Sequence, residues 1–280
     1  MKNLQDGFEL KNGVKIPCIG LGTWQARGKD CYNATLNALR AGYRHIDTAS
    51  AYGNEREVGL AIRDSGVPRE EIFVTSKLWI DMRGYDNALC GFEKSLEELG
   101  LEYLDLYLIH WPASPSKYED WVRINLSTWG GLCALYKEGR VRAIGVSNFL
   151  EHHLAPLLYS EIMPMVNQIE FHAGYMQSDI VSLCHKNGIV VEAWSPLGEG
   201  AMLKSPALAE IASKYGVSVA QLCVRWCLQN RTLPLPKSVN SDRIIENSRV
   251  FDFTIAPEDM ARINAMEYFG GSGVHPDDFE

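Results

Sequence analysis

Short apolar runs alternate with amphipathic segments along most of the chain. Runs of this length predict β-strands, which we expect at Cys18–Leu21, His45–Asp47, Ile72–Ser76, Leu104–Ile109, Ala143–Val146, Met165–Ile169, Val190–Ala193 and Thr232–Pro234. The intervening segments repeat apolar positions with a period of about 3.6 residues. They predict helices at Asp30–Ala41, Glu55–Ser65, Tyr85–Leu99, Thr128–Lys137, Leu150–Leu158, Ser178–Lys186, Pro206–Tyr215, Val219–Gln229 and Asp242–Val250. Strands that alternate with helices indicate an α/β protein.

The segment before this alternation, Phe8–Pro17, is predicted to form a β-hairpin because Asn12-Gly13 is a preferred two-residue turn. Asn54, followed three residues later by Glu57, predicts a capping box at the start of a helix. The eight strands then favour a (β/α)8 TIM barrel, as one domain over residues 1–280. A doubly wound sheet is the alternative. It would normally carry GxGxxG after its first strand, and the nearest match, Gly20–Trp24, lacks the third glycine.

The composition is that of a globular protein: 46% of the 280 residues are hydrophobic, 22% are charged, and the formal net charge is −8. The acidic balance argues against nucleic-acid binding. No run is long enough to span a membrane, and the N-terminus lacks the apolar core of a signal peptide. Seven scattered cysteines fit a reducing, cytoplasmic location. Cys223 and Cys227 could clip a metal, but core packing explains their spacing better.

Four chemically active side chains fall at or just past the ends of predicted strands: Asp47, Tyr52, Lys77 and His110. A barrel would bring them together at its C-terminal face, where barrel enzymes carry their chemistry. In water the phenol of a tyrosine titrates at about 10, and a neighbouring ammonium lowers its pKa. Lys77 could tune Tyr52 in this way, with Asp47 anchoring Lys77, and His110 could orient a carbonyl oxygen. Tyr52 then becomes a general acid.

The motifs around these residues are long and specific. Residues 42–49 with 52–55, then 104–112, then Pro236-Lys237-Ser238 with Arg243, Glu246 and Asn247, resemble the three characteristic stretches of the aldo-keto reductase superfamily. Leu235 is a mild departure, since isoleucine is commoner there. The resemblance implies a (β/α)8 barrel whose N-terminal hairpin closes the bottom. It also implies Tyr52 as proton donor, supported by Asp47, Lys77 and His110.

A general acid needs a hydride donor to reduce a carbonyl. The segment after the eighth strand gathers an ammonium, hydroxyls, helix N-terminal amides and a guanidinium, which is a natural anion site. By resemblance, Lys237, Ser238, Val239, Asn240 and Arg243 bind the 2′-phosphate end of NADPH, and Glu246 and Asn247 meet its adenine. Two cations aimed at one phosphate favour NADPH over NADH, although dual use stays open.

The nicotinamide needs amide recognition and a stacking face. Ser147, Asn148 and Gln168 can all hydrogen-bond a carboxamide, and by resemblance Trp194 is the aromatic platform, commonly tyrosine in relatives. Residues expected to line the rest of this site, with Asp47, are Gly22, Thr23, Ser195 and Leu197. No metal is expected, because the histidines show no ligand spacing. His152 and His153 are adjacent and are expected at the surface.

The indoles of Trp24, Trp79 and Trp111 follow strands and suit an apolar substrate pocket around His110. Residues 114–126 are expected to be a loop over the pocket, from which Trp121 could reach the substrate. Gly130-Gly131 would loosen the following helix, at about 1 kcal/mol for each glycine. Phe171-His172-Ala173 lacks a proline usual in relatives, which predicts a different turn. The short acidic tail, residues 269–280, predicts an open mouth.

These features resemble the compact microbial aldo-keto reductases, which include 2,5-diketogluconate reductases, glyoxal reductases and protozoan prostaglandin F synthases. We therefore expect NADPH-dependent reduction of small aldehydes and ketones by a monomer. Two alternatives stay open. A redox-sensing barrel like the potassium-channel β subunits would keep the cofactor but turn over slowly. A phosphosugar isomerase would use Lys237 and Arg243 for its substrate and leave the Tyr52–Lys77 pair without a role.

Overall fold

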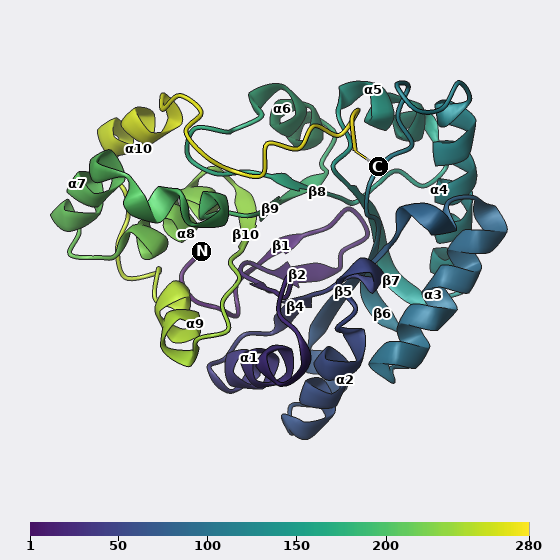
Figure 1. Ribbon diagram of the computed structural model, residues 1–280, viewed down its shortest axis with the longest axis horizontal. Coiled ribbons are helices and arrows are strands. Elements are labelled where there is room, and N and C mark those ends of the chain that lie inside the picture. Colours follow the sequence, from purple (N-terminus) through teal and green to yellow (C-terminus); the bar gives the residue numbers. More distant parts are fainter. Residues whose placement is uncertain (280) are drawn as a thin grey trace.

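Within residues 1–279, which the computed structural model describes, eight parallel strands lie side by side and helices surround them (Figure 1). The strands are β3 (Leu21–Gly22), β4 (His45–Asp47), β5 (Phe73–Leu78), β6 (Leu104–Ile109), β7 (Val141–Ser147), β8 (Val166–Glu170), β9 (Val190–Trp194) and β10 (Thr232–Leu235). A parallel bridge between Gly22 and Lys237 joins the first strand to the segment after the last. This confirms the predicted (β/α)8 barrel. The predicted first strand, Cys18–Leu21, begins later than expected.

The helices follow the strands in order. They are α1 (Gly28–Arg40), α2 (Glu55–Asp64), α3 (Tyr85–Leu99), α4 (Trp121–Lys137), α5 (Glu151–Leu154), α6 (Ser178–Lys186), α7 (Pro206–Lys214), α8 (Val219–Gln229), α9 (Ser241–Ser248) and α10 (Pro257–Asn264). The last one, α10, had no counterpart in the sequence prediction. Cys223 and Cys227 are buried on α8, which confirms their assignment to the core.

A hairpin of β1 (Gly7–Glu9) and β2 (Lys15–Pro17) covers one end of the barrel. Asn12 in its turn donates to the carbonyl of Arg142, at the start of β7, over 2.9 Å. The hairpin therefore closes the N-terminal end of the strands, as expected, and leaves chemistry to the opposite end.

Helix α4 begins at Trp121, seven residues earlier than predicted. The loop predicted at residues 114–126 is therefore limited to residues 114–120. Its two glycines lie inside the helix and against α3. A Cβ on Gly131 would stand 2.7 Å from the carbonyl oxygen of Tyr85 and 2.8 Å from the Cβ of Ala88. The prediction of a loose helix start is therefore wrong, since the absence of a side chain at Gly131 permits close helix packing.

The predicted capping box at Asn54 is also wrong. The side chain of Asn54 does not cap α2. Its amide nitrogen donates to the carbonyls of Thr23 and Ala26, each over 2.9 Å, and its oxygen accepts from the Thr48 hydroxyl over 2.7 Å. This residue ties together the segments that follow β3 and β4, at the end of the barrel where the candidate site lies.

Candidate active site

Tyr52, Lys77 and Asp47 form one hydrogen-bonded group beside the C-terminal ends of β4 and β5. Lys77 Nζ donates to Asp47 Oδ1 over 2.6 Å, to the carbonyl of Thr48 over 3.0 Å and to Tyr52 Oη over 3.2 Å. The Lys77 side chain is fully buried and that of Asp47 is 4% exposed, so water screens this ion pair little. Tyr52 itself is carried by a short 3₁₀ turn, Ser50–Tyr52, directly after β4.

The electrostatics of this group differ from the simple expectation for Tyr52. Burial raises the pKa of Tyr52, the Lys77 ammonium lowers it and Asp47 raises it, so the net shift is upward. The expected influence of Lys77 is present, but burial outweighs it. For Lys77, burial opposes the charged form, yet Asp47 and Tyr52 leave the pKa of Lys77 raised. Lys77 is therefore an ammonium and Tyr52 a protonated phenol at neutral pH.

His110 completes the predicted four. Its ring lies edge-on to that of Tyr52, with centroids 5.5 Å apart, and edge-on to Trp79 at 5.0 Å. Burial and the Lys77 charge hold the pKa of His110 well below its usual range, so its imidazole is neutral. A neutral imidazole carries one N–H, with which it can donate a hydrogen bond to a substrate oxygen.

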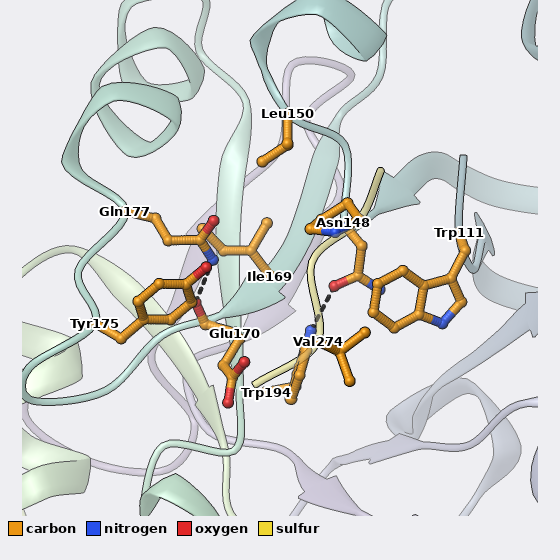
Figure 2. A pocket seen from close by; sticks show the side chains of 10 residues that line it. Trp111, Asn148, Leu150, Ile169, Glu170, Tyr175, Gln177, Trp194 and Val274 are labelled. Atoms are coloured by element: carbon orange, nitrogen blue, oxygen red, sulfur yellow. Dashed lines mark hydrogen bonds between the residues drawn. The ribbon is translucent and has the colours of Figure 1, made fainter. Parts of the chain in front are cut away.

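The polar residues at the ends of β7, β8 and β9 form a second group. Gln168 Nε2 donates to Asp47 Oδ2 over 2.8 Å, which links it to the first group. Asn148 donates to the carbonyl of His110 over 3.0 Å and accepts from the indole N–H of Trp194 over 2.8 Å. The Ser147 hydroxyl donates to the carbonyl of Gln168. The Asn148 amide is thus engaged within the protein, and it fixes the orientation of the Trp194 indole (Figure 2).

Backbone strain marks the same strand ends. Asn148 has φ of 63° and Ser195 has φ of 48°, in the left-handed region that residues other than glycine rarely adopt. Strained residues of this kind cluster at functional sites. Leu197 follows in the same loop. On the opposite side, Thr23 is buried and its hydroxyl donates to the carbonyl of Asp47 over 2.9 Å.

The predicted anion site lies at the N-terminus of α9. Asn240 caps the helix by accepting from the N–H of Arg243 over 3.0 Å, and the Ser238 hydroxyl accepts from the N–H of Asn240. The side chains of Lys237 and Arg243 are exposed, and neither has an ion-pair partner among residues 1–279. Val239 is exposed as well, while Glu246 is half-buried and Asn247 is buried one to two turns further along the helix.

The expected open mouth is wrong, because the tail crosses it. The Phe279 ring stacks on Trp111 with centroids 3.9 Å apart and planes 11° apart, and it meets Trp79 edge-on at 5.7 Å. Trp111 is consequently buried, whereas Trp24 remains 44% exposed. In Figure 1 the tail runs from α10 past β8 toward α5.

Asp277 holds the tail in this position. Its Oδ1 lies 2.9 Å from His152 Nε2 and 3.1 Å from His153 Nε2, and its carbonyl accepts from the Ser114 hydroxyl over 2.9 Å. His153 is fully buried, so the expectation that both histidines lie at the surface is wrong for it. Trp121 contacts the same two imidazoles edge-on. Its expected reach over a substrate stays a prediction.

The cluster of His152, His153 and Asp277 has a spacing that could hold a metal ion. Its hydrogen bonds favour another role. The N–H of Leu150 donates to His153 Nδ1 over 3.2 Å, which requires Nδ1 to be unprotonated. A neutral His153 then carries its proton on Nε2, where it faces Asp277. The three side chains therefore act as a clamp on the tail.

A second anchor holds the tail at Glu170, the last residue of β8. Its carboxylate accepts from the N–H of Ser272 over 2.7 Å and from the Ser272 hydroxyl over 2.6 Å. Val274, two residues on, lines a narrow cavity together with Trp111, Asn148 and Trp194 (Figure 2). The tail thus forms one wall of the site. The nearby turn at His172–Tyr175 is closed by paired backbone bonds and by Gly174, with φ of 81°.

Comparison with known proteins matches this chain to the aldo/keto reductase family over residues 18–267. The chain belongs to the aldo/keto reductase family. It is 48% identical to the glyoxal reductase of Bacillus subtilis, over 99% of this chain and 98% of that protein. Among solved structures it matches an aldo-keto reductase from a deep-sea metagenome library, with 44% identity, a TM-score of 0.90 and coverage of 98% and 100%. A Bombyx mori aldo-keto reductase in complex with NADP matches at 36% identity and a TM-score of 0.85, over 92% of each chain.

Membership in this family makes the chain an oxidoreductase that acts on carbonyl or alcohol groups. The family typically uses a nicotinamide cofactor, and the reductase carries a donor set that fits one. The Gln168 amide nitrogen is used by protein groups, which leaves its carbonyl oxygen for a carboxamide N–H. The two exposed cations at the N-terminus of α9 fit a phosphate. No helix in the described part of the chain is long and apolar enough to cross a membrane.

Sequence reasoning missed three residues of the reductase that shape the site: Phe279, Asp277 and Glu192. Glu192 accepts from Gln168 Nε2 over 2.8 Å and is fully buried. One signal was available for it, because a carboxyl group interrupts the apolar run Val190–Trp194. A lone aromatic residue in an acidic tail was the only signal for Phe279.

Proposed function

We propose that this reductase catalyses the NADPH-dependent reduction of small aldehydes and ketones to alcohols. The observation that carries the proposal is the position of Tyr52 Oη, 3.2 Å from the buried ammonium of Lys77 and beside the His110 ring. A phenol held this way can give its proton to a carbonyl oxygen, because the ammonium next to it stabilises the phenolate that remains.

When bound, the reduced nicotinamide supplies the hydride that adds to the carbonyl carbon. The carbonyl oxygen then takes its proton from Tyr52. His110, neutral and in contact with both Tyr52 and Trp79, orients that oxygen by donating an N–H. Asp47 balances the charge of Lys77, so that the ammonium stays in place while the phenol is protonated and while it is ionised.

The cofactor would lie across the C-terminal end of the barrel. Gln168 would meet the carboxamide through its amide oxygen, with Ser147 and Asn148 beside it, and Trp194 would stack on the ring, with Gly22, Thr23, Ser195 and Leu197 around it. Lys237 and Arg243 would bind the 2′-phosphate, with Ser238, Val239 and Asn240 beside them and Glu246 and Asn247 at the adenine. Support for this placement comes from two exposed cations at the capped start of α9, Lys237 and Arg243, which have no ion-pair partner in the described part of the chain.

The substrate pocket would be bounded by Trp24, Trp79, Trp111 and Phe279. Three indoles and a phenyl ring around one polar corner favour compact carbonyl compounds with little polar surface of their own. The similarity to a glyoxal reductase supports small dicarbonyls as one class of substrate.

The test is the loss of reduced-nicotinamide absorbance on addition of methylglyoxal, glyceraldehyde or benzaldehyde, with NADPH and NADH in parallel. We expect turnover with at least one aldehyde and a lower KM for NADPH than for NADH. Tight retention of NADPH with turnover of a few per hour would favour a redox-sensing barrel instead. Isomerisation of a phosphosugar without nicotinamide would refute the proposal.

A further inference from the structure

Glu192 is a buried carboxyl group that the reaction described above does not use. It lies on β9, in register with Gln168 on β8, and Gln168 is in register with Ser147 on β7. These three side chains form one row across the barrel. Glu192 is fully buried, as is its neighbour His45. The row therefore runs from the predicted nicotinamide site to a fully buried carboxyl group on β9.

Gln168 joins Glu192 to the catalytic group. Its amide nitrogen donates one hydrogen to Asp47 Oδ2 and the other to Glu192 Oε2, each over 2.8 Å. A continuous chain of contacts thus runs from Tyr52 through Lys77, Asp47 and Gln168 to Glu192. Both amide hydrogens are spent on carboxyl groups, so the orientation of this amide depends on Glu192 as well as on Asp47.

Two ionised carboxylates could not both be stable on either side of one amide nitrogen. The ammonium of Lys77 lies 2.6 Å from Asp47 and compensates that charge. Among residues 1–279, Glu192 has no cation at such a distance. His45 Nε2 lies 3.8 Å from Glu192 Oε1, but burial and the Lys77 charge lower the pKa of His45 to about 3, so the imidazole is uncharged. Glu192 Oε1 has no hydrogen-bond partner among the described residues, which a carboxylic acid tolerates better than a carboxylate does.

We propose that Glu192 is a protonated carboxylic acid at neutral pH and acts as a positioning residue, orienting the Gln168 amide and keeping the Asp47–Lys77–Tyr52 group electrically balanced. The catalytic consequence of this proposal rests on the proposed function. The protonation state of Glu192 does not, because it depends on the chain alone. The facing groups are His45 and Asp47 on β4, Lys77 on β5 and the Gln168 amide on β8.

The sign of the pH dependence follows from this environment. Burial first, and then the charge of Asp47, raise the pKa of Glu192 to about 8 from an ordinary value of 4.5. The folded protein therefore binds one more proton than the unfolded chain between these two values, and stability falls as pH rises through that window. Above about 8 a new negative charge appears behind Asp47. It raises the pKa of Tyr52 further and makes the phenol a weaker acid.

The test compares the wild type with Glu192→Gln, whose amide copies the shape and neutrality of the protonated acid and still offers an oxygen to Gln168. Infrared spectra recorded from pH 6 to 9 should show a protonated-carboxyl C=O band that fades near pH 8. That band should be absent from the variant. Glu55 is another buried glutamate with a raised pKa. The Glu192 band is therefore assigned from the difference between the spectra of the wild type and Glu192→Gln. Glu170→Gln is the matched control, since burial there is outweighed by bonds from His172 and Ser272 that lower the pKa of Glu170.

Stability gives a second readout that does not involve activity. The Tm of Glu192→Gln should rise relative to the wild type as pH goes from 5 to 8, and the gap should then stay constant. Glu192→Leu, which cannot accept from Gln168, should weaken NADPH binding by about tenfold, whereas Glu192→Gln should bind within about twofold of the wild type.

Kinetics give the third readout. The reductive kcat of the wild type should fall near pH 8, and that fall should be missing in Glu192→Gln. The proposal would be overturned if the spectra of the wild type and Glu192→Gln showed no carboxyl difference from pH 6 to 9 and if the Tm curves of the two proteins ran parallel. If the infrared and stability results hold while Tyr52 proves dispensable, the proposed function fails and the protonation of Glu192 stands.

Discussion

The pairing of Lys77 with Asp47 should dominate the energetics of the site. Lys77→Met would leave the Asp47 carboxylate buried with Gln168 as its remaining side-chain donor among residues 1–279, and Asp47→Asn would leave a buried ammonium whose acceptors are all neutral. Removal of one partner of a buried ion pair typically costs about 3–5 kcal/mol. The double variant holds no buried charge at this position, so it should cost little more than either single variant. The coupling free energy should then be about 3 kcal/mol.

The measurement is urea unfolding at pH 7 of the wild type, both single variants and the double variant, with the m-value checked for constancy. Lys137 and Glu161 supply a matched control, because their ion pair has nearly the same length, 2.7 Å, but lies on the surface. The same cycle on that pair should give coupling within experimental error. If the two single costs at Lys77 and Asp47 add to within about 0.5 kcal/mol, the reasoning about burial is refuted.

Three further predictions concern the cofactor, the tail and the fold. Arg243→Ala should raise the KM for NADPH by about tenfold or more and leave that for NADH nearly unchanged, because a charge-assisted contact to the 2′-phosphate is lost; equal changes for both cofactors would contradict the phosphate assignment. Asp277→Asn should release the tail and expose Trp111, seen as a shift of tryptophan emission to longer wavelength that Phe279→Ala reproduces; if neither variant shifts the emission, the stacking of Phe279 on Trp111 is not the dominant solution state. Gly131→Ala should lower the free energy of unfolding in urea by about 1–3 kcal/mol, because its Cβ would meet the backbone of α3. Gly130→Ala, whose Cβ would stand 3.3 Å from the Tyr85 ring, should be neutral or slightly stabilising. Similar effects at both glycines would argue against close packing at Gly131.

Local patterns predicted the barrel well. The strand His45–Asp47 and the helix Tyr85–Leu99 have the predicted bounds. The helix repeats apolar positions regularly and ends at Gly100, which is a common end for a helix. The proton-transfer residues could also be located in advance, since parallel strands in a barrel present their C-terminal ends at one face.

Features that depend on long-range contacts could not be predicted. Trp121, the first residue of α4, packs its indole on His152 and His153, which lie on α5. Asn54 lost its capping role to carbonyls of Thr23 and Ala26, some thirty residues earlier. The path of the tail is set by anchors at Glu170 and at the two histidines. None of these partners is visible to a window of neighbouring residues.

The start of α10 carries a local sequence signal. Pro257 occupies the first turn, and Glu258 and Asp259 follow it, which is a common start for a helix. Tyr215 and Lys214 then bind Asp259 and fix this helix against α7.

The central claim is that Tyr52 gives the proton in carbonyl reduction, and Tyr52→Phe tests it most directly. Removal of one hydroxyl leaves the Lys77–Asp47 bond of 2.6 Å and the predicted cofactor contacts in place. Turnover of methylglyoxal should therefore fall by about 10² or more, while the Kd for NADPH, measured by quenching of tryptophan fluorescence, should change less than about threefold. A variant that keeps most of its turnover would contradict the account.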